Sequence, residues 1–393
     1  MVFTPLHTGY LTSRRVYRGS LETRRKAPCD SRALLETTSP KLLWNSVSVR
    51  FAEHLRTYKM HQEVFDRPFN FSAFYKTFPP GVLKPDRKFL EWFVGFSEGD
   101  GSFIVTGDRC IFTITQRDEP LLQLIQQTLG FGSIYPVRSS PGKFHYYVSS
   151  LKKDIFPLIQ LFNGNLLLKK TNERFKSWVA NYNRRRGTEL LVISRWDGTF
   201  KPVEHASQSD SAFQAVSLKR TSVVWNSSWL AGFVDAEGSF FVELRKLDAV
   251  RLKIGGNPRF LINQKGEAEL LLHLAFLISR GCFSSVVREK PDTTLENVIY
   301  QFRASSRISL KLIQDYFDSH PLRGKKALSY SKWCQVILEL EKVKVLSDLA
   351  SPKVQAFLAS PKALIPEKTC FHQEEHKKLV ALVKDINPSE SKT

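Results

Sequence analysis

Residues 85–105 read PDRKFLEWFVGFSEGDGSFIV, and residues 225–244 read WNSSWLAGFVDAEGSFFVEL. In each stretch, apolar residues recur at helical spacing until a glycine interrupts them, and a run of β-forming residues follows. The pattern predicts a helix that passes directly into a strand, with Asp86 as N-cap of the first helix and Ser227 or Ser228 as N-cap of the second. The chain therefore contains an internal repeat.

The similarity continues downstream of both stretches. Residues 112–137 and 260–287 each predict a strand, a helix with one apolar face and a second strand. Another alternating strand and further helices follow in both copies. Each half therefore reads α-β-β-α-β-β-α-α, which predicts an α+β fold built from two similar halves.

The repeat divides the chain into five predicted segments. These are a basic N-terminal arm (1–84), a first half (85–186), a linker (187–226), a second half (227–348) and a C-terminal tail (349–393). The arm is predicted to be largely disordered, because prolines interrupt any period in it. Its first 32 residues hold seven Lys or Arg against two acids, which is typical of an organellar transit segment, of a disordered basic arm or of upstream coding sequence fused in frame.

The composition points to a polyanionic partner. The 393 residues carry 58 Lys and Arg against 38 Asp and Glu, a net charge of +20. This positive field favours nucleic acid, and membrane insertion is excluded because no apolar run approaches the ~18 residues that a spanning helix needs. The five cysteines are scattered, which argues against a disulfide framework or a zinc finger and favours a reducing compartment.

Small residues and acids recur together in the two predicted helices. Gly95 and Gly99 lie four apart in the first helix, and Gly232 and Ala236 hold the matching places in the second. Small side chains at this spacing allow two helices to pack almost backbone to backbone.

Such packing would bring two helix-terminal acids, Asp100 and Glu237, close together. Either acid alone suits an ordinary helix end before a glycine, but two paired acids repel each other unless a divalent cation such as Mg²⁺ binds both. Glu98 and Asp235, two places earlier, point elsewhere on the helix and are interpreted as capping or hydrogen-bonding groups.

FVGFSEGDG at 93–101 and LAGFVDAEG at 230–238 resemble the two motif copies of the LAGLIDADG family of single-chain homing endonucleases. The resemblance covers residues 85–345. It implies two αββαββα halves, each with a four-stranded antiparallel saddle-like sheet, packed through the motif helices. The first copy departs from the family pattern at Ser97 and Gly99. By resemblance, the metal site consists of the following residues: Asp100, Glu237, Gly99 and Ala236.

The family also places a polar residue at the end of the strand that follows the motif and a lysine near the start of a later helix. The matching residues are Gln116, Gln264, Lys170 and Lys326. Gln can order the attacking water, and Lys can stabilise charge on the phosphate. Lys169 and Lys325 are adjacent to these lysines, so the sequence leaves open which member of each pair serves the site.

Polar side chains alternate with apolar ones along the predicted strands, which directs the polar set to one face of each sheet. Such a face can lie along a major groove, where Arg and Gln read base edges and Lys neutralises phosphates. The predicted DNA-binding residues are Arg138, Lys143, His145, Arg251, Lys253, Gln301 and Arg303.

The sequence thus predicts a monomeric endonuclease that hydrolyses double-stranded DNA with Mg²⁺ or another divalent cation such as Mn²⁺. The resemblance implies 3′ overhangs, an intron-encoded origin and an organellar location, in the mitochondrion rather than the chloroplast. Two alternatives keep the same fold: an RNA maturase that binds its intron, and a DNA-binding protein without catalysis. The acids Asp100 and Glu237 favour cleavage over the maturase, because a splicing helper needs no such acids.

Overall fold

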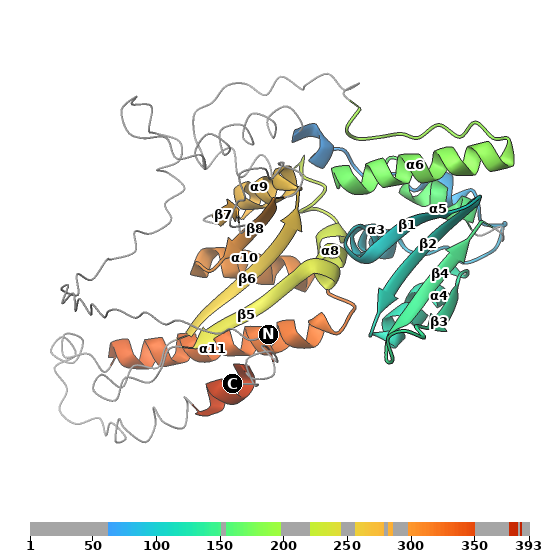
Figure 1. The fold of residues 1–393 in the computed structure, drawn as a ribbon. Coiled ribbons are helices and arrows are strands. Elements are labelled where there is room, and N and C mark those ends of the chain that lie inside the picture. The colour runs from blue at the N-terminus through green and yellow to red at the C-terminus, as the bar shows by residue number, and fades with distance from the viewer. Residues whose placement is uncertain are drawn as a thin grey trace, which may run out of the picture. The chain divides into compact units, whose positions relative to one another are not determined.

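The computed structural model describes residues 62–150, 155–197, 221–244, 256–278, 282–285, 298–349, 377–383 and 386. All of them belong to one compact unit, Thr38–Thr393. Figure 1 shows two sheets with two motif helices, α3 and α8, between them.

The first half contains four helices and four strands among its described residues. They are α3 (Arg87–Asp100), β1 (Gly101–Thr106), β2 (Arg109–Gln116), α4 (Glu119–Leu129), β3 (Ser133–Pro136), β4 (Phe144–Ser149), α5 (Ile155–Phe162) and α6 (Lys169–Arg186). The strands form an antiparallel sheet in the order β1-β2-β4-β3.

The second half repeats this plan in the part of the chain that the structure describes. Its elements are α8 (Trp229–Glu237), β5 (Gly238–Leu244), β6 (Gly256–Lys265), α9 (Ala268–Leu277), β7 (Cys282–Ser285), β8 (Ile299–Ala304), α10 (Arg307–Ser319) and α11 (Lys326–Leu349). Its sheet has the equivalent order β5-β6-β8-β7. The predicted α+β fold with two pseudo-symmetric halves is confirmed.

Local sequence signals account for these elements. The side chain of Asp86 accepts the backbone N–H of Phe89 at 2.7 Å and so caps α3 as predicted. Ser228 is the N-cap residue of α8, but its own N–H is bound by the Glu91 carboxylate at 3.1 Å. Helix α4 ends at Gly130, which adopts a φ of 78° that glycine tolerates best.

Each sheet packs one face against helices through aromatic side chains. In the first half, the ring of Phe103 on β1 contacts Phe162 of α5 and Trp178 of α6. In the second half, Phe240 on β5 contacts Phe317 of α10 and Trp333 of α11 in the same way. These helices cover the core face. On the opposite face, here called the open face, described side chains such as Ile104 and Arg303 are exposed.

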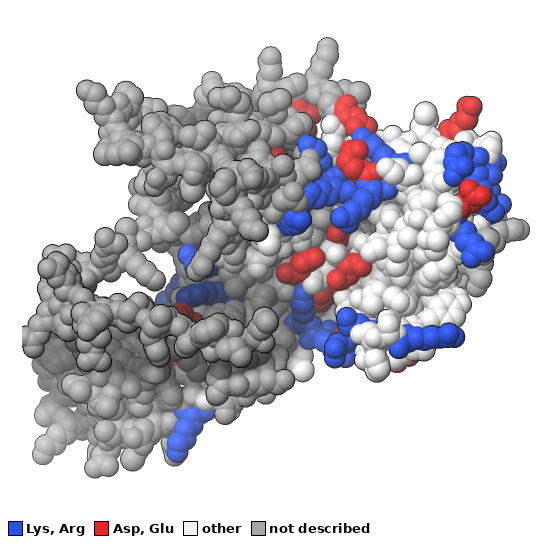
Figure 2. Space-filling model, viewed as in Figure 1, with Lys and Arg blue, Asp and Glu red and all other residues white. Residues whose placement is uncertain are grey.

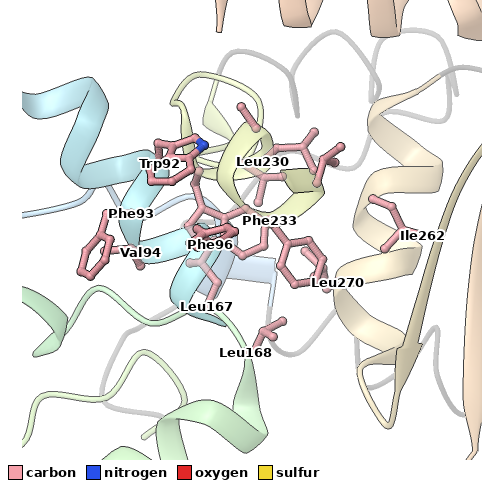
Figure 3. Close-up of a cluster of buried hydrophobic side chains, with 14 of the residues drawn as sticks. Trp92, Phe93, Val94, Phe96, Leu167, Leu168, Leu230, Phe233, Ile262 and Leu270 are labelled. Carbon is pink, nitrogen blue, oxygen red and sulfur yellow. The ribbon is translucent and has the colours of Figure 1, made fainter. Parts of the chain in front are cut away.

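The two motif helices pack in direct contact. A Cβ atom added to Gly95 would lie 2.9 Å from the backbone nitrogen of Phe233, and one added to Gly232 would lie 2.8 Å from that of Phe96. Apolar side chains of both helices surround the crossing, as Figure 3 shows for Trp92 and Phe96 of α3 and for Leu230 and Phe233 of α8. The predicted role of the small residues in helix packing is confirmed.

The prediction of a largely disordered arm through residue 84 is wrong for residues 62–84. Phe65, Phe69, Phe71 and Phe74 in that segment are buried in the core. Phe65 ends the 3-10 helix η1 (Gln62–Phe65) and Phe74 lies in the one-turn helix α2 (Ser72–Tyr75), and these elements are too short to show a helical period in the sequence. Residues 1–61 lie outside the described part.

The predicted linker also contributes buried residues. The guanidinium of Arg195 donates to the carbonyl oxygens of Gly164 at 2.9 Å and of Val64 at 3.0 Å. It also lies over the ring of Phe69, 5.0 Å from the centroid. Burial lowers the pKa of Arg195 to about 9. This side chain therefore joins residues 187–197 to the segment that precedes α3.

Candidate active site

The two motif acids lie at the paired ends of the two packed helices. Asp100 is the last residue of α3 and Glu237 is the last residue of α8. A Cβ atom added to Gly99 would lie 3.0 Å from Cγ of Glu237 and even nearer to Cβ of Ala236. The four residues predicted for a metal site are therefore brought together, although α3 and α8 are more than 100 residues apart in the chain.

The paired ends of α3 and α8, here called the seam, are an unfavourable place for two negative charges. Burial, and then the neighbouring charge of Glu237, raise the pKa of Asp100 to about 6. Burial also raises the pKa of Glu237. The positive charge of Lys326 acts in the opposite direction on both carboxyl groups. A cation at the seam would remove the remaining repulsion.

Each acid has a glutamine partner at the end of a neighbouring strand. The amide of Gln116, the last residue of β2, donates to the Asp100 carboxylate. Gln264, next to the end of β6, forms a side-chain hydrogen bond with Glu237 that lowers the pKa of that carboxyl. The two predicted glutamines therefore occupy equivalent places beside the two acids.

The structure distinguishes the two lysines of the second pair. The ammonium group of Lys326 donates to the carbonyl oxygens of Ala236 at 2.6 Å and Val234 at 3.1 Å. Burial lowers its pKa, while the charges of Asp100, Asp235 and Glu237 raise it. Lys325 instead donates its backbone N–H to Asp118 at 2.9 Å. Lys326 is thus the member placed with the acids.

The first lysine pair has different surroundings. The backbone N–H groups of Lys169 and Lys170 donate to the carboxylate of Glu267 at 3.3 Å and 3.0 Å. The charge of Lys170 lowers the pKa of Glu267, which burial raises to about 7. The charge of Lys326, by contrast, lowers the pKa of both Asp100 and Glu237.

The donor set fits a hard divalent cation. No group of three or more His, Cys, Asp or Glu occurs among the described residues, so a softer, fully protein-enclosed site is not present in that part of the chain. Two carboxylates and nearby backbone carbonyls are what Mg²⁺ uses when water and phosphate oxygens complete its shell. The residues that would hold it are Asp100, Glu237, Gly99 and Ala236.

Glu98 and Asp235 form hydrogen bonds as interpreted from the sequence. Glu98 accepts the backbone N–H groups of Leu167 at 2.8 Å and Leu168 at 2.6 Å, just before α6. Asp235 accepts those of Arg323 at 2.8 Å and Gly324 at 3.2 Å, just before α11. Glu98 therefore positions the start of α6, and Asp235 positions the start of α11.

Two tryptophans complete this arrangement, and sequence reasoning missed them. Trp229 donates its indole N–H to Glu98 at 2.6 Å, and Trp92 donates to Asp235 at 2.9 Å. Each tryptophan thus binds the acid of the opposite half. The available signal was their equivalent position, three residues before Gly95 and Gly232.

The predicted DNA-binding residues lie on or beside the open faces of the sheets. Arg138 and Lys143 lie in the turn between β3 and β4, and the ring of His145 on β4 is hydrogen-bonded to Thr115 at 2.8 Å. Gln301 and the exposed Arg303 are on β8. The remaining two predicted residues, Arg251 and Lys253, lie outside the described part.

Basic side chains form several separate groups on the face shown in Figure 2, with acidic side chains between them. At the end of α6, Arg184 and Arg185 pair with Asp108 at 3.3 Å and 3.0 Å. None of the described helices is long and apolar enough to span a bilayer.

Comparison with known proteins identifies the family. The profile of the LAGLIDADG endonucleases matches residues 93–182 and 230–337, half of the chain. The chain belongs to this family. It is 30% identical to "Probable intron-encoded endonuclease 4" of Neurospora crassa over 251 residues. This match covers 63% of this chain and 39% of that protein.

A second relative is "Probable intron-encoded endonuclease Cox1-I1b" of Schizosaccharomyces pombe, 26% identical over 261 residues, 62% of this chain and 63% of the relative. The chain thus spans less than two thirds of these two curated relatives. Among solved structures, the meganuclease I-SmaMI bound to DNA has the same fold, with a TM-score of 0.50 and 17% identity over 78% of this chain and 99% of that one.

Proposed function

We propose that this chain is a site-specific endonuclease that cuts double-stranded DNA by metal-dependent hydrolysis and promotes the mobility of the intron that encodes it. The observation that supports this most strongly is the pairing of Asp100 and Glu237 at the ends of α3 and α8. Family membership and the net charge of +20 point the same way.

The two acids and the carbonyl oxygens of Gly99 and Ala236 would hold a divalent cation, with Mg²⁺ or Mn²⁺ as the proposed ion. When bound, that ion supplies Lewis acidity and a water of lowered pKa. The chain's own residues then orient the reactants. Gln116 and Gln264, already bonded to the acids, would position the attacking water.

Lys326 would stabilise the negative charge that develops on the phosphate, because its ammonium is bound to the carbonyl of Ala236, next to Glu237, and is subject to the charges of both acids. Lys170 is proposed as its counterpart in the other half.

DNA would lie against the open faces of both sheets, and one copy of the chain supplies both halves, so we expect a monomer. Arg138 and Lys143 in their turn suit phosphate contacts, while Gln301 and Arg303 suit base edges. Two relatives from Schizosaccharomyces pombe carry "Cox1-I1b" and "cox1 intron-2" in their names. They support an organellar location for this chain, which we propose is the mitochondrion.

The test uses purified full-length protein and a duplex in which the exons that flank its reading frame are joined. We expect cleavage of both strands with Mg²⁺ and none with EDTA. The uninterrupted gene, in which the intron separates the exons, is the matched control and should stay intact. Failure to cut the joined exons together with tight binding of the intron RNA would replace the proposal with the maturase alternative.

A further inference from the structure

The open faces of the two sheets carry different side chains at equivalent positions. Residues paired across antiparallel strands share a face. In the first sheet the register joins Ser102, Thr113, Tyr147 and Ser133 into one row across all four strands. In the second sheet the equivalent row contains Ser239, Leu261 and Arg303.

A second row lies nearer the active site, because its members are adjacent to Gln116 and Gln264 in their strands. It consists of Thr115, His145 and Tyr135 in the first sheet and of Asn263 and Gln301 in the second. In each of the two sheets, this second row contains a hydrogen-bonded cross-strand pair. Thr115 bonds His145 at 2.8 Å, and Gln301 donates to Asn263 at 2.9 Å.

The first open face is apolar and hydroxyl-rich. Ile104 and Tyr135 are exposed on it by 38% and 51%, and the ring of Tyr135 packs edge-on against Tyr147. Strands β1 to β4 are described throughout, and the permanently charged side chain on this face is Arg109 at the outer end of β2. Away from Arg109, strands β1 to β4 present no permanently charged side chain on this face, so the surface suits the methyl group of thymine better than the acceptors of guanine.

The second open face carries groups that read purines. Arg303 is exposed and has no ion pair among the described residues, whereas Arg259 nearby is paired with Glu243. An unpaired Arg matches the O6 and N7 acceptors of guanine. In the Asn263–Gln301 pair, the internal bond uses the Asn oxygen, leaving an Asn donor and a Gln acceptor. One donor beside one acceptor complements N7 and N6 of adenine.

Resting on the proposed function, we propose which bases each half of the target presents to the two sheets. The half-site under the first sheet is rich in T·A pairs, and the half-site under the second presents a guanine to Arg303. An adenine lies about two base-pair steps from that guanine, on the side of the cleavage site, facing Asn263 and Gln301. Two residues along a strand span about 6.8 Å, close to two base-pair steps, which sets the expected spacing between guanine and adenine.

The test is selection of bound duplexes from a randomised library by the full-length protein in EDTA, followed by sequencing. We expect one T·A-rich half and one half with the guanine and adenine. Arg303→Ala should reduce the preference for that guanine on the order of tenfold and leave other positions unchanged. Tyr147→Arg, at the equivalent place in the first sheet, should create a new guanine preference in the T·A-rich half.

Lys311→Ala is the matched control, since it removes one exposed positive charge from α10, which packs on the core face. It should leave every base preference in place. Enriched duplexes whose guanine survives Arg303→Ala, or whose halves have the same composition, would overturn the asymmetry while leaving DNA recognition intact. Failure to enrich any duplex would overturn the proposed function together with the inference.

Discussion

Lys326 is the single residue in which the geometry goes furthest beyond the sequence. Lys325 and Lys326 match the family pattern equally well. If the helix began one residue earlier or later, the other lysine side chain would face the acids. Asp118 binds the backbone N–H of Lys325, and this contact directs Lys326 toward the acids. The sequence contains both lysines but does not contain that contact.

We predict that Lys326→Met reduces the rate of DNA cleavage on the order of a hundredfold or more, because it removes the positive charge that acts on both Asp100 and Glu237. Lys325→Met removes the same charge one residue away and should change the rate only a few-fold. Single-turnover cleavage of the joined-exon duplex measures both rates. A larger loss in Lys325→Met than in Lys326→Met would reverse the assignment.

His273 on α9 makes stability depend on pH. Its ring is fully buried, stacks on Phe65 with centroids 4.5 Å apart and bonds Ser222 at 2.7 Å. Burial lowers its pKa to about 3. Between pH 3 and 6.5 the unfolded chain therefore binds a proton that the folded chain does not. The contribution of the neutral His273 ring to the free energy of unfolding is complete above pH 6.5 and is lost as the pH falls.

We predict that the wild type loses about 1.4 kcal/mol of unfolding free energy per pH unit, relative to His273→Gln, between pH 6 and pH 4. Buried acids such as Glu267, whose pKa is raised, contribute equally to both proteins and cancel in the difference. Urea unfolding at several pH values measures it. Parallel pH profiles for the two proteins would show that His273 is protonated in the folded state.

At the scale of elements, α3 and α8 are held by two crossed hydrogen bonds as well as by close packing. Each bond joins a tryptophan of one helix to the acid of the other, Trp92 to Asp235 and Trp229 to Glu98. Removing one hydrogen-bond donor from a buried carboxyl group lowers the stability of the folded state, because water cannot reach the group to replace that donor.

We expect Trp92→Phe and Trp229→Phe each to destabilise the fold by about 1–3 kcal/mol more than Trp333→Phe. The three changes remove the same volume from buried sites, and the indole N–H of Trp333 has no hydrogen-bond partner among the described residues. Guanidinium unfolding of the three variants measures the difference. Equal losses in all three would mean that packing, not the crossed bonds, accounts for the effect.

The order of the elements follows from the sequence more fully than their contacts do. Alternation, capping at Asp86 and the small residues Gly95 and Gly232 predict the strands, the start of α3 and the helix pair. These signals are local or repeat at a fixed spacing. The crossed bonds of Trp92 and Trp229 depend on how far each helix is rotated about its axis, which spacing alone does not specify.

At the scale of the whole molecule, two halves with one topology have become unequal. The sheets have the same strand order, yet Tyr147 in one stands where Arg303 stands in the other. The repeat in the sequence predicts the symmetry, and only the three-dimensional contacts reveal where the symmetry is broken.

The central claim is that one carboxylate from each half forms a single catalytic site for a divalent cation. Its most direct test is Mg²⁺-dependent cleavage of the joined-exon duplex by Asp100→Asn and Glu237→Gln, beside Asp315→Asn as an exposed control on α10. Either motif variant should lose double-strand cleavage while it still binds the duplex in a mobility-shift assay, and Asp315→Asn should cut normally. Cleavage of both strands at the wild-type rate by either motif variant would contradict the claim.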